Sequence, residues 1–168
     1  MSLVFSKCVH RGSKPSLIPV RCSLALCLHD SSGERQFTGV DKSRAALIIA
    51  VLIKQAGLKL QDHAIFVNVV SGVKLEDTAG DLAIAASICS SFLEFPVPNN
   101  IAFIGEIGLG GELRPVPRMD KRVTAVAKLG YKKCIVPKSA EKSLATLQLG
   151  LEILGCKNLR EVINSVFR

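Results

Sequence analysis

The chain has 168 residues and a formal net charge of +8, with 48% hydrophobic and 21% charged residues. This length suits one domain, and this composition excludes an intrinsically disordered chain. The longest apolar stretch, residues 45–53, is about half the length of a membrane span, so no membrane partner is expected.

The N-terminal half of the chain carries alternating strand and helix signals. Asp41 is a suitable N-cap for a helix with apolar residues at helical spacing, and Gly57 is a suitable stop. Residues 64–70 are rich in β-branched side chains, which indicates a buried strand. The expected elements are a strand at 17–28, a turn at 30–33, its hairpin return strand at 36–40, a helix at 45–55 and a strand at 64–70.

The C-terminal half begins with a second helix. Thr78 is the predicted N-cap, and residues 82–93 are apolar almost all round, which indicates a central buried helix. The elements expected after it are a strand at 101–105, a turn at 108–111, a return strand at 112–116, a helix at 120–129, a strand at 133–137, a helix at 139–147, a strand at 152–154 and a last helix from Asn158. Strands that alternate with helices predict an α/β (α+β) fold.

Six widely spaced cysteines contain no C-x-x-C pair, so neither a zinc ribbon nor a redox motif is predicted. Cys89 and Cys134 lie in apolar runs and are expected in the core. This cysteine usage suits a reducing intracellular compartment. We expect no metal and no cofactor.

The glycines at 105, 108, 110 and 111 invite comparison with a phosphate-binding loop. Such a loop must open a helix, whereas these glycines precede a strand-like segment, so we expect a β-turn. The three histidines (His10, His29 and His63) lie in loops or polar flanks, which disfavours a catalytic triad.

The excess of basic residues suits a polyanion such as nucleic acid, although an ordinary basic surface is the alternative. The chain has no Trp, one Tyr and seven Phe, which favours phosphate contacts over base stacking. The candidate phosphate-binding residues are Lys42, Arg44, Arg114, Arg118, Lys121 and Arg122. Positive charge at a helix start, as between residues 118 and 122, opposes the helix dipole, so contact with phosphate or with an acidic neighbouring subunit is as good an explanation as an ordinary solvated surface.

Four motifs in fixed order carry a family resemblance. They are FVNVVSGVK (66–74), EDTAGDLA (76–83), FIGEIGLGGELRPVP (103–117) and AKLGYKKCIVP (127–137). They resemble the Lon-like C-terminal domain of the RadA/Sms DNA-repair proteins, and most closely its plant organellar versions. Residues 12–20 resemble the first strand of that domain, which favours a domain at 12–168 after a tail at 1–11. An organelle transit peptide is the alternative for the acid-free start of the chain.

The resemblance implies a Lon proteolytic-domain-like fold, a mixed sheet flanked by helices that is shared with the second domain of a small-subunit ribosomal protein. Lon peptidases use a serine at a helix N-terminus and a lysine as its base. Gly80 and Asp120 stand at these two positions, so a degenerate peptidase site and no enzyme activity are expected. The alternative is a relocated peptidase site built from Thr78 or Ser71 with Lys121.

RadA/Sms proteins, as the resemblance implies, are hexameric RecA-like ATPases of DNA repair and recombination. Their Lon-like domain is a non-proteolytic platform for ring assembly and DNA binding. The expected partners are therefore branched or single-stranded DNA, further copies of this chain in a hexameric ring, and a RecA-like ATPase, because the sequence contains no phosphate loop. A pure oligomerisation module is a further alternative. The compartment would be a plastid or mitochondrion for a plant family member, and otherwise the cytoplasm.

Overall fold

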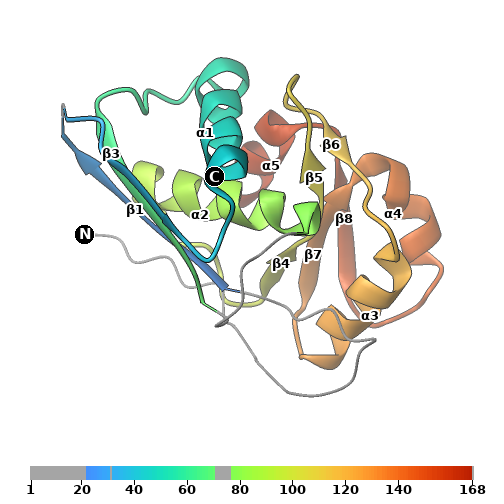
Figure 1. The fold of residues 1–168 in the computed structure, drawn as a ribbon. Helices are drawn as coiled ribbons and strands as arrows, with labels where there is room; N and C mark the ends of the chain where they lie inside the picture. The colour runs from blue at the N-terminus through green and yellow to red at the C-terminus, as the bar shows by residue number, and fades with distance from the viewer. Residues whose placement is uncertain (1–21, 31, 71–76, 168) are drawn as a thin grey trace.

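A computed structural model describes residues 22–30, 32–70 and 77–167. In this described part of the chain, two three-stranded sheets and a small hairpin form the β structure, and helices lie between and around them (Figure 1). The strands are β1 (Cys22–His29), β2 (Arg35–Thr38), β3 (His63–Val70), β4 (Ile101–Phe103), β5 (Glu106–Ile107), β6 (Leu113–Arg114), β7 (Lys133–Pro137) and β8 (Glu152–Cys156). The helices are α1 (Lys42–Ala56), the short 3-10 turn η1 (Thr78–Gly80), α2 (Asp81–Leu93), α3 (Met119–Lys128), α4 (Lys138–Ala145) and α5 (Leu159–Val166).

The first sheet has the order β1-β3-β2, with β1 antiparallel and β2 parallel to the central strand β3. The second sheet has the order β4-β7-β8 and is parallel throughout. In Figure 1 helix α2 crosses the space between these two sheets, and α3 and α4 lie at the outer side of the second sheet. This mixture of helices with parallel and antiparallel strands confirms the α/β class.

Helix α2 is the centre of the core because its sequence is apolar on nearly every face. Ten of its residues are buried, including three serines and Asp81. Residues of α1, α2, α5 and the first sheet form one hydrophobic cluster, and residues from α3, α4 and β7 form a second. Cys89 and Cys134, predicted as core residues, are 1% and 0% exposed.

Local signals located most elements correctly. The Asp41 carboxylate accepts the backbone N–H of Arg44 at 3.0 Å, and Gly57 ends α1 with a φ of 75°, as predicted. Strand β7 spans the predicted residues, and Asn158 caps α5 by accepting the N–H of Glu161. The predicted tail, the start of the domain at residue 12 and the strand residues before Cys22 lie outside the described residues.

One predicted pairing is wrong. The segment expected as the hairpin return of the first strand forms β2, which pairs with β3 in parallel. Strand β3 therefore lies between β1 and β2, and the short, largely exposed strand β2 forms an edge of this sheet. A turn after β1 is present, with Gly33 donating its N–H to the Asp30 carbonyl, but it does not close a two-stranded hairpin.

No helix of the described residues combines the length and the apolar character that crossing a membrane requires.

Candidate functional site

The turn before α2 holds Gly80, one of the two positions that the Lon resemblance singles out. Thr78 was predicted to cap α2, but it is the first residue of the 3-10 turn η1, which Asp77 caps by accepting the N–H of Ala79 at 3.0 Å. Asp77 lies one residue before the predicted cap, Thr78. Its carboxylate stabilises the 3-10 turn η1, which the chain makes before α2 begins. Gly80 then occupies the N-cap of α2 with no side-chain hydrogen bond.

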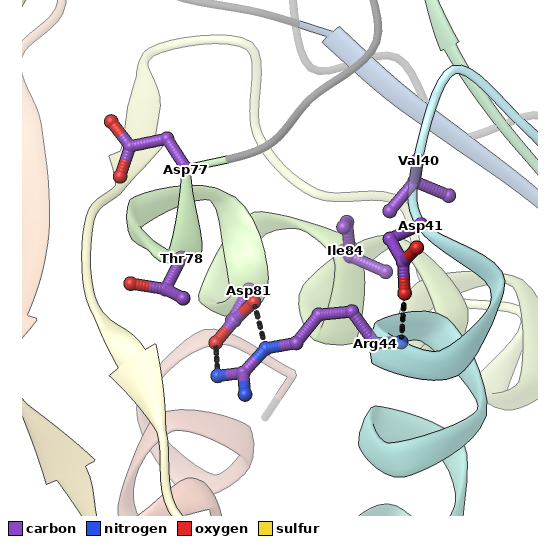
Figure 2. Close-up of a pocket in the computed structure, with 7 residues that line it drawn as sticks. All are labelled: Val40, Asp41, Arg44, Asp77, Thr78, Asp81 and Ile84. Carbon is purple, nitrogen blue, oxygen red and sulfur yellow. Dashed lines mark hydrogen bonds and ion pairs between the residues drawn. The ribbon is translucent and has the colours of Figure 1, made fainter.

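Directly after Gly80, the buried Asp81 forms an ion pair with the partly exposed Arg44 (Figure 2). The Arg44 Nε donates to one carboxylate oxygen at 2.9 Å, and its Nη2 donates to the other. The N–H of Ile107 donates to the same carboxylate at 3.1 Å. Burial raises the pKa of Asp81, while Arg44 and this N–H oppose the rise; the bond to Asp81 raises the pKa of Arg44. Arg44, predicted as a phosphate contact, is therefore directed inward.

Arg122 and Asp77 form a second ion pair, which connects α3 to the turn before α2. The Arg122 Nη2 lies 2.7 Å from the Asp77 carboxylate, and the Arg122 Nε donates to the Pro117 carbonyl at 2.9 Å. Burial raises the pKa of Asp77, but the Ala79 N–H and the Arg122 guanidinium outweigh it and lower the pKa below its ordinary value. The Arg122 side chain is only 7% exposed, so its guanidinium does not face solvent as the sequence-based prediction required.

Arg114 lies on the β5–β6 hairpin between two carboxylates. It forms ion pairs with Glu112 and, at 3.9 Å, with Glu106. Its side chain is exposed, but the two carboxylates give this group of three residues a net negative charge. Arg114 therefore does not belong to a basic surface, and the predicted cluster of residues 114–122 divides into paired and unpaired members. The turn of this hairpin at residues 108–111 agrees with the prediction, since Gly111 has a φ of 80°.

Two exposed cations on helix α3 and one at its N-cap define what we call the α3 basic face: Lys121, Lys128 and the N-cap residue Arg118. None of them has an ion pair with a described residue, whereas Lys133 after the helix pairs with Glu152 at 2.9 Å. Lys121 and Lys128 are two helical turns apart, which places them on one side of α3. Asp120 is exposed beside them in the first turn. Lys42 is exposed at the first residue of α1.

A cavity of about 50 Å³ lies where α1 meets the turn before α2 (Figure 2). Its polar lining consists of Asp41, Arg44, Asp77, Thr78 and Asp81. Ligand pockets usually enclose about 300–1,000 Å³, so this cavity has room for water but not for a peptide. No group of three metal-binding side chains occurs among the described residues.

Other candidate nucleophiles and bases lie elsewhere. His29 and His63 face each other on paired strands at a ring distance of 5.3 Å, while His10 and Ser71 lie outside the described residues. Burial raises the pKa of both Cys89 and Cys134 to about 12, so these thiols stay protonated near neutral pH and are poor nucleophiles.

The sequence reasoning missed the carboxylates that engage the arginines. Asp81 is 37 residues from Arg44, and Asp77 is 45 residues from Arg122. No helical or strand spacing relates positions so distant, so no local signal could have identified these pairs. The only warning was the density of acidic residues in the 76–81 motif itself.

The fold and site define an α/β domain in which two ion pairs anchor the start of a buried central helix next to a helix with an exposed basic face. A family model described as subunit ChlI of Mg-chelatase matches residues 38–140, which is more than half of the chain. The chain belongs to this family.

Several relatives named DNA repair protein RadA match a longer stretch. Those of Streptococcus pyogenes serotype M1 and Bacillus subtilis are 42% and 41% identical over 156 residues. That of Pseudomonas aeruginosa is 36% identical over the same length. These alignments cover 93%, 92% and 93% of this chain, but only 34%, 33% and 34% of the three relatives in turn. The chain thus spans about a third of the length of the curated relatives that it matches.

Proposed function

We propose that this chain is a non-proteolytic domain of the RadA type that acts in DNA repair and recombination by binding DNA phosphates and supporting assembly of a ring. Its fold would be the Lon-like fold. The support is the similarity to proteins named DNA repair protein RadA over 93% of the chain. The observation that carries the DNA-binding part is the α3 basic face.

Phosphate binding fits this face for two physical reasons. Exposed cations bind polyanions by releasing the counterions of the nucleic acid, and Arg118, Lys121 and Lys128 form no ion pair with any residue that the structure describes. The N-terminus of α3 also has no side-chain cap, so its backbone N–H groups and the positive end of the helix dipole add to the charge of Arg118 and Lys121. By contrast, Arg44, Arg114 and Arg122 already interact with carboxylates.

The absence of peptidase activity is part of the proposal. Glycine at position 80 offers no nucleophile, and aspartate at position 120 offers no amine base. Thr78 lines the small cavity, but Lys121 is exposed on α3 and does not line it. Cleavage of casein that disappears in Thr78→Ala or Lys121→Ala would contradict the proposal and establish a relocated peptidase site.

DNA affinity measured across a salt series tests the central claim. We expect affinity to fall steeply as the salt concentration rises. In the double variant Arg118→Ala/Lys121→Ala, the negative slope of log affinity against log salt should become shallower by about 1.8. The matched control is Arg35→Ala/Lys59→Ala, which removes the same charge from exposed positions in or next to the first sheet. Equal losses in both variants, or binding that ignores salt, would contradict a specific role for α3.

Sedimentation with and without DNA tests the assembly claim. A hexameric ring, alone or with a RecA-like ATPase, is the expected assembly. Rings that form normally but bind no duplex, branched or single-stranded DNA would instead favour an oligomerisation module.

DNA as a partner also implies that the chain resides in a DNA-containing compartment. Localisation of a tagged full-length protein to an organelle or to the cytoplasm would identify that compartment.

A further inference from the structure

We infer that Asp77 and Arg122 form a positioning pair that holds the first turn of α3 in its DNA-binding shape, although neither residue touches DNA. This inference rests on the proposed function and concerns the same surface. It assigns a role to a buried arginine that sequence reasoning counted among the phosphate contacts.

The strained residue in this surface is Arg118. Its φ of 59° and ψ of 41° place it in the left-handed region, immediately before α3. For a residue other than glycine, this sparsely populated backbone conformation costs about 1–3 kcal/mol in stability. It persists only where neighbouring contacts enforce it. Some other group must therefore hold this turn in place.

Arg122 supplies the restraint. Its Nε donates to the Pro117 carbonyl at 2.9 Å, and its backbone N–H donates to the Arg118 carbonyl at 3.1 Å. The second bond is the ordinary backbone bond of the first helical turn, so the restraint that depends on the arginine side chain is its bond to the Pro117 carbonyl, directly before the left-handed position. Its side chain is 7% exposed, so it reaches these groups from inside the protein while Arg118 and Lys121 remain outside.

Asp77 fixes Arg122 in turn. One oxygen of its carboxylate accepts the Ala79 N–H at 3.0 Å, and the other lies 2.7 Å from the Arg122 Nη2. Because η1 holds the carboxylate on one side, the guanidinium has a fixed partner on the other. The geometry of the exposed cations at the start of α3 therefore depends on the carboxylate of Asp77, which is distant in the sequence.

The direction in which Asp77→Asn changes DNA affinity distinguishes a positioning role from simple electrostatics. Asp77→Asn keeps an oxygen for the Ala79 N–H but removes a negative charge close to the basic face, so simple electrostatics predicts tighter DNA binding. A positioning role predicts weaker binding, with a salt slope lowered by about 1–2 because Arg118 and Lys121 no longer both reach phosphates. Glu152→Gln, which makes the same charge change at an exposed pair, is the matched control.

Arg122→Lys gives a second, independent test. Lysine keeps the charge but cannot bind the Pro117 carbonyl and the Asp77 carboxylate through two fixed nitrogens. A positioning role predicts that it behaves like Arg122→Gln, that the double variant with Asp77→Asn is no weaker than either single variant, and that hydrogen exchange of the Arg122 amide becomes faster without DNA. Melting temperatures show that each variant is measured in the folded state.

The results distinguish the inference from the proposal on which it rests. Tighter binding by Asp77→Asn together with full binding by Arg122→Lys would make Arg122 a phosphate contact and overturn the inference. Unchanged binding in both variants, while Arg118→Ala/Lys121→Ala loses affinity, would also overturn it but leave the proposed function intact. Unchanged binding in Arg118→Ala/Lys121→Ala would overturn both.

Discussion

Removal of the Asp81 carboxylate should be among the more damaging single changes in this domain. Asp81→Leu keeps the branched shape in a larger side chain but leaves the Arg44 guanidinium without its partner and the Ile107 N–H without an acceptor. A buried unsatisfied N–H costs about 1–3 kcal/mol. Loss of one member of a buried ion pair costs about 3–5 kcal/mol, a figure that the 26% exposure of Arg44 reduces because its charge can turn toward water.

We therefore expect a total loss of about 3 kcal/mol in the free energy of unfolding, or about 6–12 °C in melting temperature for a chain of this size. Urea unfolding followed by circular dichroism measures it. Arg44→Met/Asp81→Leu removes both charges together, so it should be about 1–2 kcal/mol more stable than the sum of the two single changes predicts.

Glu152→Gln, at an exposed ion pair, is the control and should cost less than about 0.5 kcal/mol. A loss below about 1 kcal/mol for Asp81→Leu, or single changes that simply add in the double variant, would refute the argument that this pair acts as one buried unit.

Four further outcomes follow from individual positions. Arg118→Gly should be about 0.5–1 kcal/mol more stable than Arg118→Ala, because only the alanine keeps a Cβ at a φ of 59°, while both weaken DNA binding equally; the usual preference for alanine would contradict that conformation. Gly39→Ala should cost at least about 2 kcal/mol in urea unfolding, since its φ is 75° and a Cβ would lie 2.5 Å from a main-chain oxygen of β3. The pKa of Asp77 is lowered by folding, so its carboxylate stabilises the fold above the unfolded pKa and stops doing so as pH falls through the folded pKa; Asp77→Asn should flatten this acid loss in unfolding titrations. Cys89 and Cys134 should react with a thiol reagent at neutral pH only as fast as the chain unfolds, and rapid labelling of the native protein would show that they are accessible.

The amino-acid sequence alone determined the elements whose signals are local. Asp41 and Gly57 bound α1 because a cap and a left-handed stop depend on neighbouring residues only. The continuous apolar character of residues 82–93 predicted a buried helix for the same reason, and α2 is the centre of the core. The motifs of the family were equally readable, since they consist of contiguous residues.

Only the tertiary structure decided which strands pair with each other and which cations pair with carboxylates. Strand β2 pairs with β3, which follows it by a whole helix, because pairing is chosen by the packing of the sheet and not by the turn that precedes it. Six cations looked equivalent along the chain, yet three of them engage carboxylates that the fold brings alongside. The position of a charged residue in the sequence does not identify its ion-pair partner. The α3 basic face can therefore be recognised only once the fold shows that Arg44, Arg114 and Arg122 engage carboxylates.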